Sequence, residues 1–308
     1  MPTLKIGSLT LDNQLLLAPM FKVTDPAFRL LCREQGAALT FTEMTHSEAI
    51  LRNPRVAAQA SHTTPSDHPF GIQVSSAQPD RLIQTIQLLE EKADLFDINL
   101  GCPSDRTRES GIGSALLDHP DRVEALIHAM RKATQKPITA KIRLPSRPQD
   151  ALDIAKRIEN AGADGLTVHA RTVLQGHSGP VDLDLVAKVK ETLSIPVINN
   201  GGVWNQETYE YVLHTTHCDG VMLARSAIGN PGIFAQVQGK PGISPVDGLV
   251  RYLDHCETYG FLHVGRIKTN CLHFLSAIPK TKKADFSKAK TITELKALAA
   301  EVKANQTN

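Results

Sequence analysis

The chain has 308 residues, of which 41% are hydrophobic and 21% charged, and its formal net charge is +2. This is enough to bury a full core, and it suits one α/β domain of roughly 250 residues with a smaller domain beside it. No apolar run approaches the ~18 residues of a membrane span, and no signal peptide is recognisable, so we expect a cytoplasmic protein without a membrane segment. The five cysteines are odd in number and widely spaced, which argues against a disulfide framework and a zinc site.

Eight short apolar runs alternate with segments of helical spacing. The expected strands are 15–20, 38–43, 69–74, 95–100, 138–144, 165–170, 196–202 and 220–226. Helical patterns between them cover 79–92, 120–133, 148–162 and 181–193. This alternation predicts an α/β fold, a parallel (β/α)8 TIM barrel. A doubly wound open sheet is the alternative, because the sequence does not show whether the sheet closes.

After residue 231 the alternation stops, and we expect a small all-α C-terminal domain. Its predicted helices are 245–260, 261–277 and 291–304, with a turn at 279–283. The glycine and proline residues at 239–242 indicate a linker, which divides the chain into 1–239 and 240–308. Residues 261–308 carry nine Lys and Arg against three acidic residues, a local charge of +6. This favours a polyanionic partner, with a solvated helical surface as the alternative.

Residues 95–103, LFDINLGCP, form the most informative stretch. The apolar run predicts a buried strand that delivers Asn99 and Cys102 to its carboxyl end, where parallel α/β folds place their chemistry. A thiol at this position has three alternative roles: it acts as a nucleophile, it acts as a general acid, or it only packs against its neighbours. The other strands also end in notable residues, which should meet at one mouth: Met20, Glu43, Gln73, Lys141, His169, Asn200 and Arg225.

Two of these strand ends indicate an anionic ligand. Asn200-Gly201-Gly202 and Ala224-Arg225-Ser226 combine glycines, backbone N–H groups and a guanidinium after the last two strands. Lys141 lies in an apolar strand, where burial is costly unless the ammonium meets an anion or an electron-rich ring. Arg143 should point the same way by strand alternation. His169 faces the same mouth, with a satisfied core histidine as the alternative.

Several motifs, in order from about residue 14 to 234, resemble the tRNA-dihydrouridine synthases. They are LLLAPMFKVTDPAFR, Gln73, DINLGCP with the following GIGSALL, KIRL, HARTVLQGHSG, PVINNGG and ARSAIGNP. In addition, RIKTNCLHFL (266–275) resembles part of the family's helical domain. The resemblance implies an FMN enzyme on a (β/α)8 barrel, with a helical domain that helps to grip tRNA. It also implies that NADPH reduces the flavin, that the flavin N5 passes a hydride to C6 of a uridine, and that a cysteine supplies the proton at C5.

The resemblance assigns roles by position. Cys102 is then the proton donor, and Asn99 lies beside it near flavin and base. The residues expected to line the FMN are Pro19, Met20, Phe21, Gln73, Asn99, Lys141, His169, Asn200, Gly201, Gly202, Ala224 and Arg225. The residues expected to contact RNA, besides Asn99, are Arg106, Arg171, Arg266 and Lys268. We expect tRNA as the partner, no metal, and a monomer.

The sequence departs from the family pattern at four positions. Asp105 stands where the family usually has a lysine, although Arg106 or Arg108 could substitute for it. His177 replaces a usual tyrosine, Gly202 an aspartate and Ala224 a glycine. Two alternatives therefore stay open. One is a flavin oxidoreductase of free pyrimidines, similar to dihydroorotate or dihydropyrimidine dehydrogenases, against which the basic tail argues. The other is an RNA-binding paralogue that has lost activity through Asp105.

Overall fold

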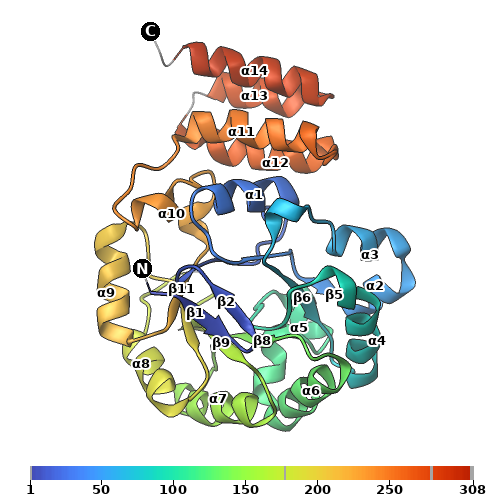
Figure 1. The fold of residues 1–308 in the computed structure, drawn as a ribbon, viewed down its shortest axis with the longest axis vertical. Helices are drawn as coiled ribbons and strands as arrows, with labels where there is room; N and C mark the ends of the chain where they lie inside the picture. Colours follow the sequence, from blue (N-terminus) through green and yellow to red (C-terminus); the bar gives the residue numbers. More distant parts are fainter. Residues whose placement is uncertain (1, 177, 278–279, 306–308) are drawn as a thin grey trace.

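The computed structural model describes residues 2–176, 178–277 and 280–305. Eight parallel strands form its centre (Figure 1). In chain order they are β3 (Leu15–Leu17), β4 (Thr40–Phe41), β6 (Phe70–Ser75), β7 (Leu95–Leu100), β8 (Ile138–Leu144), β9 (Gly165–Thr172), β10 (Val197–Asn200) and β11 (Gly220–Leu223). A further short strand, β5 (Thr45–His46), pairs with the end of β6.

The sheet closes on itself. Consecutive strands pair in parallel from β6 round to β11, β11 pairs with β3, and β4 pairs with β6. A parallel bridge between Leu16 and Leu39 then joins β3 to the segment that leads into β4. The predicted (β/α)8 barrel is therefore confirmed, and the open doubly wound sheet is excluded.

Fourteen α-helices occur in the described residues, and most of them surround the barrel (Figure 1). Proline begins α1, α4, α6 and α11, which suits a first-turn position because proline lacks an N–H. The helices are α1 (Pro26–Glu34), α2 (Ser47–Arg52), α3 (Pro54–Ala60), α4 (Pro79–Leu89), α5 (Asp105–Glu109), α6 (Pro120–Ala133), α7 (Ala151–Asn160), α8 (Leu183–Thr192), α9 (Gln206–Thr216), α10 (Ile233–Gln236), α11 (Pro245–Thr258), α12 (Val264–Phe274), α13 (Lys280–Lys288) and α14 (Ile292–Ala304).

An N-terminal hairpin that the sequence analysis missed covers one end of the barrel. Its strands are β1 (Leu4–Ile6) and β2 (Leu9–Leu11), which pair antiparallel. Leu4, Ile6 and Leu11 are buried and belong to the same apolar cluster as barrel-interior residues such as Leu16 and Ile198. Because the hairpin packs against the starts of the strands, only the carboxyl ends are left to form a site.

Four strands are shorter than predicted: only Thr40–Phe41 of the run 38–43 lies in the sheet, and three more strands end early. The runs 15–20, 196–202 and 220–226 leave the sheet at Leu17, Asn200 and Leu223. Gly201 and Gly202 have φ values of +109° and +83°, which are incompatible with a strand and suit glycine. The polar ends of these runs are therefore loop residues over the mouth of the barrel, and this exposes their backbone N–H groups to a ligand.

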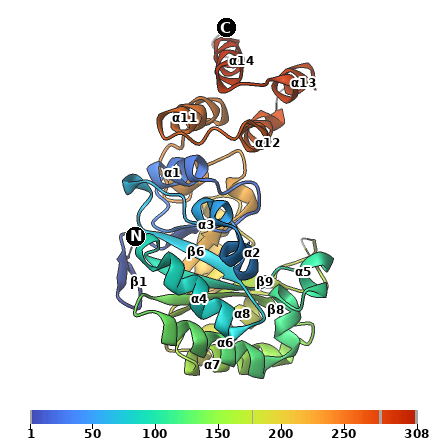
Figure 2. The same ribbon diagram turned by 90° about the vertical axis from the view of Figure 1, so that its right-hand side faces the viewer.

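The C-terminal helices stack on one side of the barrel, with α1 between it and the pair α11 and α12 (Figure 2). Phe28 of α1 contacts Phe274 of α12 edge to face, with ring centroids 6.2 Å apart. The predicted turn at 279–283 is wrong for residues 280–283, which form the start of α13. Residue 279 lies outside the described residues. This helix has little amphipathic pattern and is anchored by the buried Phe286, which explains why the lysine-rich sequence was not read as helical. The domain boundary near residue 239 stays a prediction.

Two kinds of feature are absent from the described residues. None of the helices there is both long and apolar enough to cross a membrane. No group of three or more His, Cys, Asp or Glu side chains within 2–176, 178–277 and 280–305 is placed to hold a metal ion.

Candidate active site

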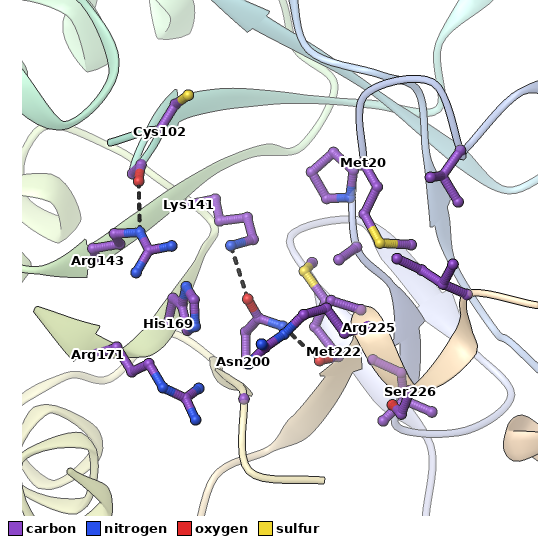
Figure 3. Close-up of a pocket in the computed structure, with 18 of the residues that line it drawn as sticks. Met20, Cys102, Lys141, Arg143, His169, Arg171, Asn200, Met222, Arg225 and Ser226 are labelled. Atoms are coloured by element: carbon purple, nitrogen blue, oxygen red, sulfur yellow. Dashed lines mark hydrogen bonds between the residues drawn. The ribbon is translucent and has the colours of Figure 1, made fainter. Parts of the chain in front are cut away.

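A cavity of about 440 Å³ lies at the carboxyl ends of the barrel strands (Figure 3). Every residue that the sequence analysis expected around a flavin lines it. These are Pro19, Met20, Phe21, Gln73, Asn99, Lys141, His169, Asn200, Gly201, Gly202, Ala224 and Arg225. Cys102 and Arg171 line the same cavity. The ends of seven strands from distant parts of the sequence thus meet at one place, and the volume is in the ordinary range for a cofactor site.

One side of the cavity is built to take an anion. Gly201 packs closely, since a Cβ there would lie 3.3 Å from both Arg171 Nη1 and His169 Cδ2. Asn200 Nδ2 donates to the Met222 carbonyl at 2.8 Å, which fixes the start of this turn. The Arg225 guanidinium lies 5.4 Å from the ring centroid of the half-exposed Trp204, which also lines the cavity. A glycine-rich backbone and a neighbouring guanidinium are groups that can bind an anion such as phosphate.

Four cationic side chains line this one cavity: Lys141, Arg143, Arg171 and Arg225. Lys141 Nζ donates to Asn200 Oδ1 at 2.9 Å, and burial lowers the pKa of Lys141 to about 8. Burial also lowers the pKa of Arg143 to about 10; the negative charge of Cys102 opposes this, while Arg171 and Arg225 add to it. Because these positive charges disfavour one another, an anionic ligand would stabilise all four.

A hydrogen-bonded chain links the barrel interior to the Cys102 backbone. The buried Asp97 carboxylate accepts from Gln73 Nε2 at 2.8 Å and from the Thr139 hydroxyl at 2.6 Å. Gln73 Oε1 accepts from Asn99 Nδ2 at 3.0 Å. Asn99 Oδ1 then accepts from the backbone N–H of Cys102, also at 3.0 Å. Because a carboxylate only accepts, Asp97 fixes which way both amides point.

The Cys102 thiol is partly exposed at the rim of the cavity, where a ligand can reach it. Its Sγ lies 3.5 Å from the hydroxyl oxygens of Ser104 and Thr107. Burial raises the pKa of the Cys102 thiol, but the hydrogen bonds of Thr107 and Ser104 and the charge of Arg143 outweigh it, so the pKa lies below its ordinary value. The other four cysteines are buried, so Cys102 is the thiol placed for chemistry.

Three residues expected to contact RNA lie outside this cavity. Arg106 is exposed on α5, beside Asp105, in the loop that follows Cys102. Arg266 lies on α12, where its Nη2 is 2.8 Å from Glu43 Oε2. Lys268 is on the same helix and donates to the Ser287 carbonyl. Glu43, expected at the common mouth, instead lines a second cavity of about 240 Å³ with Arg266. His177 lies outside the described residues.

The sequence analysis did not name every residue of the site. Arg143 was expected to point the same way as Lys141 but was given no role. It lines the cavity, and its Nε donates to the Gly101 carbonyl at 3.0 Å. Asp97 was missed, although it lies two residues before Asn99 on the same strand and so on the same face. The sequence did not indicate Trp204 as a site residue, because the turn after β10 is what brings it to the cavity.

The model of the family described as dihydrouridine synthase (Dus) matches residues 16–306. The chain belongs to the dihydrouridine synthase family. It is 36% identical to a tRNA-dihydrouridine synthase B of Pasteurella multocida, over 75% of this chain and 70% of that protein. It is 34% identical to the Pseudomonas putida protein of the same name, over 77% and 72%, and 33% identical to that of Serratia marcescens, over 86% and 77%.

A solved structure supports the fold at a greater distance. The 2-naphthoyl-CoA reductase in complex with 2-naphthoyl-CoA aligns with 78% of this chain and 52% of that one, with a TM-score of 0.59 and 12% sequence identity. Dihydrouridine synthases act on tRNA, and membership in the family implies a flavin cofactor and an oxidoreductase that makes dihydrouridine in tRNA. The relatives therefore favour this activity over the reduction of free pyrimidines.

Proposed function

We propose that this dihydrouridine synthase reduces a uridine of tRNA to 5,6-dihydrouridine with FMN as its flavin, NADPH as the reductant and Cys102 as the proton donor. The observation that carries the proposal is the convergence of an anion cradle, Lys141 and a reachable thiol on one cavity. This combination matches a flavin phosphate at one end and a reacting base at the other.

The residues present fit FMN. The backbone of Gly201 and Gly202 with Arg225 would hold the phosphate, where an added Cβ would intrude on the cradle. Lys141, Gln73 and the remaining cavity residues would hold the ring, and the positive charge of Lys141 suits its electron-rich edge. When bound, FMN supplies the hydride, obtained from NADPH, that reaches C6 of the uridine.

The proton at C5 would come from Cys102. Ser104 and Thr107 hold its Sγ, and Asn99 holds its backbone N–H, so the thiol stays at the rim of the cavity. The uridine has to leave its stack to reach this point, because C5 and C6 are inaccessible inside a helix. Asn99 lines the same cavity as Cys102, where its amide would orient the cofactor or the base.

The RNA would be held mainly through its backbone. We propose Arg106 and Arg171 near the rim, and Lys268 with the other charges of residues 240–308, as phosphate contacts. Arg106 would take over the role of the lysine that Asp105 replaces. We also propose that the protein acts as a monomer in the cytoplasm, where its tRNA substrate is found.

The test is reconstitution. The purified protein is saturated with FMN and given NADPH and unmodified tRNA, and dihydrouridine is mapped by mass spectrometry. We expect noncovalent FMN, NADPH oxidation and dihydrouridine at defined positions, and Arg225→Ala should weaken FMN binding by about 10- to 100-fold. A protein that takes up no FMN would overturn the cofactor proposal. FMN uptake without product on any tRNA would favour the inactive paralogue, and equal turnover of free uracil would favour a pyrimidine reductase.

A further inference from the structure

Two residues one turn apart on α12, Arg266 and Asn270, are connected to the loop that follows β3, residues 18–25. Asn270 Nδ2 donates to the Val23 carbonyl at 3.0 Å and to Asp25 Oδ2 at 2.9 Å. The Tyr252 hydroxyl, from α11, donates to the same carboxylate oxygen at 2.7 Å. Asn270, Tyr252 and Asp25 are all buried. The helical region thus holds the last part of this loop directly.

Arg266 reaches the middle of the same loop through an intermediate. Its Nη2 lies 2.8 Å from Glu43 Oε2, and that oxygen also accepts from the Lys22 backbone N–H at 3.0 Å. Only 11% of the Glu43 side chain and 26% of the Arg266 side chain are exposed. Lys22 has a φ of +61°, a left-handed conformation that lysine rarely adopts and that needs support from its surroundings. Glu43 supplies this support.

The residues on either side of Lys22 form a wall of the active-site cavity. Met20, Phe21 and Val23 line it, and Phe21 also lines the second cavity, together with Glu43 and Arg266. If Arg266 is removed, the nearly buried Glu43 carboxylate loses its cationic partner. It would then turn toward water, and the hydrogen bond that holds Lys22 would be lost.

We propose that Arg266 is a positioning residue for the flavin pocket: through Glu43 and Lys22 it fixes the Met20 and Phe21 wall, and it does not contact RNA. The C-terminal helical region is then part of the cofactor site as well as a surface for tRNA. This replaces the expectation, made from the sequence, that Arg266 binds RNA. It rests on the proposed function in one respect, the binding of FMN in this cavity.

The experiment measures FMN affinity and tRNA affinity separately. In Arg266→Ala we expect the Kd for FMN to rise about tenfold, while the salt dependence of tRNA binding stays as in the wild type. Arg266→Lys should restore most of the FMN affinity, since an ammonium can pair with Glu43. Glu43→Gln should weaken FMN binding as well, because the pair with Arg266 is lost, and it gives a second variant should Arg266→Ala fold poorly.

The matched control is Arg251→Ala. Arg251 of α11 pairs with Glu34 of α1, also at 2.8 Å and also across the boundary between helical region and barrel. Neither residue touches loop 18–25, so FMN affinity should not change. A wild-type Kd for FMN in Arg266→Ala, with weaker tRNA binding and a smaller salt dependence, would overturn the proposal and make Arg266 an RNA contact. Failure of the wild-type protein to bind FMN would instead count against the proposed function.

Discussion

Cys102 differs from the other cysteines in lining the cavity and in having a pKa below its ordinary value. A general acid works best when its pKa is near the working pH, and the groups around Cys102 lower its pKa in that direction. The buried thiols of Cys218, Cys256 and Cys271 have pKa values raised by burial and cannot serve in the same way. The single-residue test of the proposed chemistry is therefore at position 102.

In Cys102→Ala we expect the two half-reactions to separate. NADPH should still bleach the bound flavin, because the thiol takes no part in hydride supply, while dihydrouridine formation should fall by roughly 10²–10⁴. Stopped-flow absorbance measures the first step and mass spectrometry the second. Ser110→Ala, at the exposed end of α5, is the control and should leave both steps intact. Equal loss of both steps in Cys102→Ala would show that the thiol serves the flavin or the fold instead.

Asp97 should leave a signature in the pH dependence of stability. Burial raises its pKa from an ordinary value of 3.8 to about 6, against the hydrogen bonds of Thr139 and Gln73 and the charge of Lys141. The folded state therefore binds a proton that the unfolded state has lost between these pH values, and stability falls as the pH rises from about 4 to about 6. The total effect is of the order of 3 kcal/mol.

Asp97→Asn removes this proton and should flatten the dependence. An amide can still accept from Gln73, while the Thr139 hydroxyl turns to accept from it, so the chain of hydrogen bonds can persist. Urea unfolding at pH 4 and pH 7 gives the free energy of unfolding of both proteins. We expect the free energy of unfolding of the variant to rise relative to that of the wild type as the pH rises. An equal change with pH in both proteins would contradict the raised pKa of Asp97.

At the scale of elements, the loop after β7 is held by its glycines. Gly113 has a φ of +62°, and a Cβ there would lie 2.9 Å from the Cys102 carbonyl oxygen and 2.7 Å from Thr107 Cγ2. Gly111 has a similar φ of +69°, but no atom lies within 4 Å of its added Cβ. The two positions share the backbone strain and differ only in the clash.

Gly113→Ala should therefore do more harm than Gly111→Ala. In both variants the alanine must adopt a left-handed conformation, which lowers the free energy of unfolding by roughly 1 kcal/mol. Only Gly113→Ala also displaces Cys102, and we expect its rate of dihydrouridine formation to fall more than tenfold with FMN content unchanged. Thermal unfolding and mass spectrometry measure the two effects. Similar rates in both variants would show that the loop tolerates the clash without moving the thiol.

The elements that the sequence predicted well are those with a strong local pattern. The run 95–100 coincides with β7, since it is too short for a helix, is closed by Gly101, and buries every residue but the half-buried Asn99. Helix α13 was missed, because its stability comes from Phe286 packed against other helices and not from its own periodicity. The hairpin at Leu4–Leu11 was missed for the same reason: its apolar side chains are explained only by the barrel end that they cover.

At the scale of the whole molecule, the basic character of residues 261–308 bears on how tRNA is held. We predict that Lys→Gln changes at four exposed or half-exposed positions of this region weaken tRNA binding and flatten its salt dependence, because each phosphate contact contributes about 0.7–0.9 to the slope. The positions are Lys268, Lys283, Lys288 and Lys290. FMN content should be unchanged, since none of them lines the cavity.

Fluorescence anisotropy with labelled tRNA at several salt concentrations measures the slope. The control carries the same four changes on the barrel wall, at Lys92, Lys132, Lys156 and Lys188, all exposed. It should keep the wild-type slope. If the tail variant also keeps it, the barrel rim alone holds the RNA and the tail charges are a solvated surface.

The site itself could be predicted to the extent that it depends on strand ends. Lys141, His169 and Asn200 follow from the eightfold alternation, because parallel strands bring their carboxyl ends to one mouth. The role of Arg266 could not be foreseen, since its pairing with Glu43 joins residues 223 positions apart. The position of Arg266 in a basic tail predicts an RNA contact, and only its pairing with Glu43 in the fold suggests the positioning role proposed above.

Trp204 is the only tryptophan of the chain, and it stands at the edge of the cavity beside Arg225. Its emission overlaps the near-ultraviolet absorption of an oxidised flavin, so a flavin bound in this cavity would quench it by energy transfer. The protein thus carries its own fluorescent probe at the site. Titration of the apoprotein with FMN, followed at tryptophan wavelengths, would report cofactor binding without a label and independently of any turnover.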